Sequence, residues 1–154
     1  MARLREICEG IGCHQVRTYI QSGNVVFRTR RTAHLASRLE DAIEAAAGFR
    51  PAVMVRTAAE LRAVAAANPF PAGFDPAKLA VHFLSAPPGA QLPEIATPGG
   101  ETMHLAGREL FVYYPEGMGR SKLPVARLER ALGVISTARN WNTLLQLIDL
   151  AEAW

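Results

Sequence analysis

The stretch VRTYIQSGNVVF, residues 16–27, is the part of the chain that most directly indicates a fold. From Val16 to Ile20, β-branched residues alternate with polar or aromatic ones, which is the pattern of a half-buried strand. Ser22-Gly23-Asn24 has turn chemistry, because Gly and Asn both tolerate a positive φ. A second strand starts at Val25. The stretch therefore predicts an antiparallel hairpin, with Gly23 at a positive φ.

Helical patterns lie on both sides of this hairpin. Apolar residues at helical spacing predict a helix over residues 2–11, before the hairpin. After the hairpin, a longer helix is expected to be capped by Thr32 and to end at Gly48. A β-branched segment at 52–56 predicts a third strand, and Thr57-Ala58-Ala59-Glu60 has the pattern of a capping box that opens another helix. This order of elements becomes the ferredoxin-like unit when one strand is added in front.

The second half of the chain predicts another mixed set of elements. Asn68-Pro69 ends the preceding helix, and Gly133 is expected to end a later one with Leu128 and Leu132 inward. The predicted strands lie at 79–83, 101–105, 109–114 and 134–137, and a last helix runs to about Glu152. The whole chain is therefore predicted to be α+β. It is expected to have two ferredoxin-like subdomains, residues 1–67 and 75–154, with mixed or antiparallel sheets covered by helices.

Length and composition limit the class of protein. A chain of 154 residues with 49% hydrophobic and 20% charged residues suits a folded protein that needs no metal or disulfide for stability. The net charge of +3 permits an anionic partner without requiring one. No run of 18 or more apolar residues is present, so no membrane span is expected. Cys8 and Cys13 suit free thiols in a reducing cytoplasm.

Two polar stretches that precede predicted helices are the candidate site. GMGRSK, residues 117–122, comes before one helix, and STARNWNT, residues 136–143, comes before the last, with Asn140 as the expected cap. Helix N-termini bind anions through unpaired N–H groups and partial positive charge. The residues expected to converge on one anion-binding surface are Arg120, Ser121, Lys122, Arg139, Asn140 and Asn142. The alternative is that Arg139 and Asn142 only tie the last helix to the sheet.

Other chemical signals are weaker. The spacing of Cys8 and Cys13 fits no usual zinc pattern, so no metal is expected. No dinucleotide fingerprint, Walker loop or nucleophile elbow is present, so the sequence predicts no cofactor and gives no triad pattern that would pair a histidine with Ser121 or Ser136. Aromatic residues on predicted strands can stack nucleic-acid bases, although the RNA-recognition consensus is absent. These aromatic residues are Tyr19, Phe27, Tyr113 and Tyr114.

Four motifs resemble those of the bacterial domain-of-unknown-function family 1697. They appear in the same order as in the family and lie at residues 18–27, 68–71, 119–123 and 137–143. The resemblance implies a cytoplasmic α+β protein with paired ferredoxin-like subdomains. It brings no established activity and no catalytic residues. Members usually begin with a further apolar strand and a Gly-rich loop, so the first subdomain is expected to lack its first strand. An incomplete sheet of this kind would favour self-association.

Three functions remain open at this point. The protein is expected to be an enzyme or sensor that binds a phosphorylated or carboxylated small molecule at the two helix starts. The first alternative is a nucleic-acid-binding module that uses the same basic residues. The second is a protein-interaction domain without a ligand. The sequence does not decide whether the protein is an enzyme.

Overall fold

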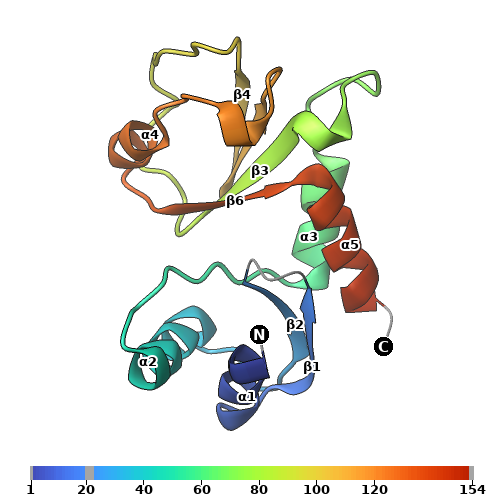
Figure 1. Cartoon of the computed structure of the whole chain (residues 1–154), viewed down its shortest axis with the longest axis vertical. Coiled ribbons are helices and arrows are strands. Elements are labelled where there is room, and N and C mark those ends of the chain that lie inside the picture. Colours follow the sequence, from blue (N-terminus) through green and yellow to red (C-terminus); the bar gives the residue numbers. More distant parts are fainter. Residues whose placement is uncertain (1, 20–22, 153–154) are drawn as a thin grey trace. The chain divides into compact units, whose positions relative to one another are not determined.

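The structure of the chain, a computed structural model, describes residues 2–19 and 23–152 (Figure 1). It is an α+β structure whose described residues form five α-helices and two antiparallel sheets. The chain divides into two compact units. Unit 1 contains the residues up to Ala58 and those from Gln146 onward, and unit 2 is Ala59–Leu145. The subdomain boundaries drawn from the sequence, 1–67 and 75–154, stay a prediction.

Unit 1 contains the predicted hairpin. Its elements are α1 (Ala2–Gly10), β1 (His14–Tyr19), β2 (Asn24–Arg28) and α2 (Leu35–Ala47). β1 and β2 pair antiparallel, with Thr18 opposite Val25, and Gly23 has a φ of +83° as predicted. The predicted strand end at Ile20 and the turn residue Ser22 lie outside the described residues. Because the alternating side chains of β1 and β2 point to two faces, one face is free to cover a core.

The end of α1 brings the two cysteines together in that core. The N–H of Gly12 donates to the carbonyl of Glu9, and the N–H of Cys13 donates to that of Cys8, each at 3.1 Å. This is the Schellman pattern, in which the residue after the left-handed glycine packs against the last turn of the helix. Cys8 and Cys13 are buried free thiols. They pack with Val16 and with the inner face of α2.

The start of α2 differs from the prediction. Thr32 does not cap the helix, because α2 begins at Leu35 and the residue at the cap position is His34, with a φ of 52° and no side-chain capping bond. Arg38 explains the later start. Its guanidinium donates to the carbonyls of Arg31, at 2.7 Å, and Ala33, at 3.3 Å, and so holds that segment outside helical geometry. The predicted end at Gly48 is confirmed, with a φ of +81°.

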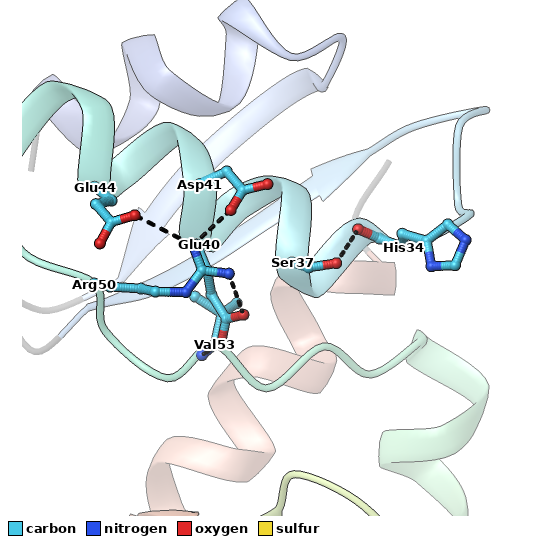
Figure 2. A network of polar contacts seen from close by, with 7 residues as sticks. All are labelled: His34, Ser37, Glu40, Asp41, Glu44, Arg50 and Val53. Carbon is cyan, nitrogen blue, oxygen red and sulfur yellow. Dashed lines mark hydrogen bonds and ion pairs between the residues drawn. The ribbon is translucent and has the colours of Figure 1, made fainter.

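The strand predicted at 52–56 does not form. In the described part of unit 1, the sheet has two strands, and residues 51–57 pair with neither. Val53 and Val55 still pack against the core. The alternating apolar pattern of this segment therefore reflects side-chain burial, although the segment has no hydrogen-bonded partner strand in the described structure. The N–H of Val53 donates to the Glu40 carboxylate at 2.9 Å, which replaces a ladder bond with a side-chain one. Figure 2 shows this contact beside Arg50, which pairs with three acidic residues of α2.

Unit 2 is built on a four-stranded antiparallel sheet. Its elements, including the parts of α3 and α5 that belong to it, are α3 (Ala58–Ala66), β3 (Leu79–Leu84), β4 (Thr102–Ala106), β5 (Glu109–Tyr113), α4 (Val125–Leu132), β6 (Ser136–Asn140) and α5 (Trp141–Glu152). The strand order is β4-β5-β3-β6. β3 is a central strand and all six of its residues are buried, although its sequence predicted alternation. Leu128 and Leu132 of α4 pack on the face formed by Ala80, Leu84 and the matching residues of β5.

Two boundaries in unit 2 differ from the sequence prediction. The strand predicted at 134–137 is β6, and it starts two residues later. The N–H of Val134 still bonds the carbonyl of Glu129 at the helix cap, and the N–H of Ile135 donates to the Ser85 hydroxyl, so the ladder begins at Ser136. The motif at 117–122 is not directly at a helix start. It contains a short 3₁₀ helix, Met118–Arg120, and α4 begins at Val125.

Candidate pocket on the sheet of unit 2

The register of the sheet places His82 beside β6. Residues directly opposite each other in an antiparallel pair lie on the same face of a sheet. His82 is opposite Ala138, and Leu84 is opposite Ser136. Because Leu84 belongs to the core under α4, His82, Ala138 and Ser136 share the face that α4 covers. A polar group in the middle of β3 is therefore directed into unit 2.

A pocket of about 230 Å³ opens at this position. Its lining combines apolar side chains with hydroxyls and an imidazole, and all of its residues belong to unit 2. They are His82, Tyr114, Met118, Ser121, Leu123, Val125, Ser136 and Ala138. A mostly apolar wall with a few polar groups is the usual composition of a small-molecule site. The volume is below the roughly 300–1,000 Å³ of pockets for drug-sized ligands, so the pocket suits a small molecule.

His82 and Tyr114 form the buried polar centre of this pocket. His82 Nε2 and the Tyr114 hydroxyl are 2.6 Å apart, and both residues are at most 3% exposed. Burial lowers the pKa of His82 to about 4, against the opposing effect of the Glu129 charge. Burial also raises the pKa of Tyr114, and the charge of Glu101 adds to that effect. Both side chains are therefore neutral at pH 7.

A glutamate holds each of the two pocket serines. The Ser121 hydroxyl donates to Glu101 Oε2 at 3.0 Å and accepts the N–H of Leu123 at 3.1 Å. Glu101 is itself buried, and its other oxygen accepts the N–H of Gly99 at 3.0 Å. The Ser136 hydroxyl donates to Glu129 Oε2 at 3.0 Å. Because each serine proton is engaged by a carboxylate, the remaining lone pairs of the hydroxyls are available to accept hydrogen bonds.

These contacts limit the chemistry that the pocket offers. A serine nucleophile needs a base that takes its proton, and histidine is the usual one. In the described residues, His82 Nε2 bonds Tyr114 and neither serine bonds a histidine. The two carboxylates behind the serines bring negative charge near the pocket. The arrangement therefore favours binding of a hydrogen-bond donor and opposes an anion.

The structure separates the residues predicted from the two polar stretches. Ser121 lines the pocket. Asn140 caps α5 as predicted, because its Oδ1 accepts the N–H of Thr143 at 2.8 Å. Arg139 is opposite Val81 on β3. Its side chain therefore points to one face of the sheet, while those of Ser136 and Ala138 point to the other. It is half-buried, its Nη1 donates to the Ala138 carbonyl at 2.8 Å, and burial lowers its pKa.

The remaining predicted residues, Arg120, Lys122 and Asn142, are exposed. The six residues do not all lie on one side of the sheet. β6 extends to Asn140, so Arg139 is a strand residue, and its side chain is on the face opposite to the pocket that Ser121 lines. Whether any of them binds an anion stays a prediction. In the described parts of the chain, no group of three or more His, Cys, Asp or Glu side chains could hold a metal ion. No helix formed by those residues is both long and apolar enough to cross a membrane.

Sequence reasoning missed the centre of the pocket. His82 lies between Val81 and Phe83 in an otherwise apolar strand, and this placement is a signal that a buried polar partner exists. The partner could not be named, because Tyr114 is 32 residues away in the chain. Glu101 gave no signal, since its contact with Ser121 spans 20 residues and a loop.

The fold of the whole chain is shared with a solved structure. It is similar to the conserved bacterial protein SP0830 from Streptococcus pneumoniae, with a TM-score of 0.69 and 20% sequence identity. The similarity covers 99% of this chain and 88% of that one. At this identity the likeness concerns the fold, and it includes the stretches at 117–122 and 136–143. A comparison with curated proteins finds no match.

A family model supplies the classification. The model described as "Protein of unknown function (DUF1697)" matches residues 1–111. The match includes the hairpin of unit 1, the Asn68-Pro69-Phe70-Pro71 motif and the strand that carries His82, while the motifs at 119–123 and 137–143 lie beyond it. With 111 of its 154 residues matched in this way, the chain belongs to the DUF1697 family, whose function is unknown.

Proposed function

We propose that unit 2 binds a small uncharged molecule that carries hydrogen-bond donors in the pocket around His82. The observation that carries this proposal is the pair of serine hydroxyls whose protons are held by Glu101 and Glu129. Each hydroxyl is left with acceptor capacity toward the pocket, beside apolar side chains that would cover the rest of the ligand. Binding is favoured over catalysis, because among the described residues the carboxylate is the only base in hydrogen-bond contact with either serine.

Charge decides between an uncharged ligand and an anion. The groups at the base of the pocket, His82 and Tyr114, are neutral at pH 7. The nearest charges in the hydrogen-bond network are carboxylates, which repel an anion at short range. A phosphorylated or carboxylated ligand would need cations in the lining, and the described lining residues include none. The anion-binding function expected from Arg120, Lys122 and Arg139 is therefore a different proposal, which a separate measurement with phosphate tests.

Acetamide and acetate are a matched pair of probes, since they share size and shape and differ in charge and in N–H donors. We expect acetamide to shift the NMR signals of the Met118 and Ala138 methyl groups, and acetate and inorganic phosphate to leave them unchanged. Ala138→Leu fills the pocket and should abolish the acetamide shifts at the Met118 methyl. Ala106→Leu is the control, because Ala106 is an exposed residue on another strand of the same sheet.

Three outcomes would overturn the proposal. Acetamide could fail to shift the pocket signals, Ala138→Leu could leave the effect on Met118 intact, or the anions could shift the pocket signals instead. Stabilisation by phosphate that Arg120→Ala abolishes would favour the anion surface. Affinity for a polynucleotide that falls steeply with salt would favour the nucleic-acid function.

We further propose a cytoplasmic location and a ferredoxin-like architecture for the two units. Cys8 and Cys13 are free thiols, the state that a reducing compartment maintains. In unit 2, the first and last strands, β3 and β6, are neighbours, and α4 precedes the last strand. This arrangement supports a split βαβ unit in which residues 85–101 replace the first helix. In unit 1, the extended segment 51–57 would correspond to the last strand.

A further inference from the structure

The two ring nitrogens of His82 have different surroundings. Nε2 is 2.6 Å from the Tyr114 hydroxyl. Nδ1 has no hydrogen-bond partner among the residues that the structure describes. It is nevertheless not sealed from solvent, because no described side-chain nitrogen or oxygen is both buried and without a partner. His82 lines the pocket, and Nδ1 is its ring nitrogen that is not engaged by Tyr114, so Nδ1 is the nitrogen available to a ligand.

Hydrogen-bond counting decides which nitrogen carries the proton. The Tyr114 hydroxyl is buried, and His82 is its hydrogen-bond partner in the described structure. If His82 donated to Tyr114, the hydroxyl proton of Tyr114 and the lone pair of Nδ1 would both lack partners. If Tyr114 donates to Nε2, the only group left over is the Nδ1–H donor. Buried polar groups are satisfied wherever geometry permits, so the second arrangement is favoured.

We infer that Tyr114 fixes His82 as the Nδ1–H tautomer and that this N–H is the donor which the pocket offers to its ligand. The inference rests on the proposed function and names the ligand more closely. A ligand that satisfies both His82 and the serines has an acceptor atom facing Nδ1 and donor atoms facing the hydroxyls of Ser121 and Ser136. Primary amides and nucleobase edges combine these groups.

The tautomer can be measured without any ligand. Long-range ¹H–¹⁵N correlation spectra at pH 7 distinguish a protonated ring nitrogen from a bare one, and His82→Gln assigns the signal among the four histidines. We expect a bare Nε2 and a protonated Nδ1. Tyr114→Phe should release the constraint and give a mixture of tautomers. Tyr113→Phe is the matched control, since Tyr113 is the neighbouring residue on the opposite face of the sheet, and it should change nothing.

Acetamide then tests the donor role. It should shift the Nδ1 and Nδ1–H signals of His82, and thioacetamide, a poorer acceptor of similar shape, should bind about tenfold more weakly, as loss of one hydrogen bond implies. A protonated Nε2 in the unliganded protein overturns the inference even if Tyr114→Phe fails to fold. Acetamide that binds without affecting Nδ1 also overturns it. Absence of acetamide binding, with the Nδ1–H tautomer present, overturns the ligand role together with the proposed function.

Discussion

At the scale of single residues, the burial of His82 links stability to pH. The pKa of His82 is lowered from 6.5 to about 4, chiefly by burial. Between these values the unfolded chain binds a proton that the native state excludes, so stability falls as the pH is lowered. The loss attributable to His82 is about 3 kcal/mol between pH 7 and pH 4. Well above pH 6.5 both states are neutral and the effect vanishes.

Replacing His82 tests this linkage. We expect His82→Gln to remove most of that part of the pH dependence, measured as the free energy of urea unfolding at pH 7 and pH 4.5. His104→Gln is the control, because His104 is exposed on β4. The same dependence on pH in His82→Gln and the wild type would show that other groups cause it.

Gly23 is a second residue whose conformation predicts a measurable cost. Its φ of +83° is unfavourable for a β-branched side chain, while the space around it is open. Gly23→Val should therefore cost about 1–2 kcal/mol through backbone strain alone. Gly73→Val is the matched control, because Gly73 is equally open and lacks a positive φ. Equal losses of unfolding free energy in the two variants would contradict the assignment of the cost to φ.

At the scale of the element, the start of α5 depends on one side chain. The Asn140 amide oxygen accepts the N–H of Thr143 at the first turn of the helix. Asn140→Ala should cost about 1 kcal/mol of unfolding free energy, while Asn140→Asp should retain most of the stability. Asn142→Ala is expected to be nearly neutral, because Asn142 is exposed two residues further on. If both alanine variants lose the same stability, the capping bond is not the cause.

At the scale of the whole molecule, the sheet of unit 1 predicts association between copies. Only two strands form it in the described structure. Arg5 donates to the carbonyl of Val16 on β1, at 2.8 Å from Nη2, so a side chain already occupies part of β1, and β2 is the strand chosen for the test. Edge strands of this kind pair with other chains. We expect sedimentation velocity to show a weight-average mass that rises with concentration.

A lysine on β2 should suppress this association. Val26 alternates with Val25 and Phe27, which pack on the core, so Val26→Lys places its charge on the other face. Ile135→Lys is the control, because it puts the same charge on an exposed apolar residue of unit 2. A monomer at all concentrations would contradict the prediction, as would equal suppression by both variants.

Local sequence patterns determined most elements of this protein. The antiparallel pairing of β1 with β2, the helix ends at Gly48 and Gly133 and the cap at Asn140 were predicted and are present. Each was predicted from nearby residues, because tight turns, caps and helical periods are local interactions. The family resemblance was likewise carried by short motifs and is confirmed over residues 1–111.

Tertiary structure decided the features that require distant partners. Residues 52–56 have a strand pattern, yet no described strand pairs with them, and Glu40 takes the N–H of Val53 instead. Pairing with β3 sets where β6 starts and ends. Because β6 includes Arg139, the side chain of Arg139 points to the face of the sheet away from Ser121. The contacts of His82 with Tyr114 and of Ser121 with Glu101 join residues far apart in the chain. A sequence pattern indicates the burial and the periodicity of its own segment. A strand pairing or a buried polar pair also requires a partner strand or side chain, which only the folded chain brings into place.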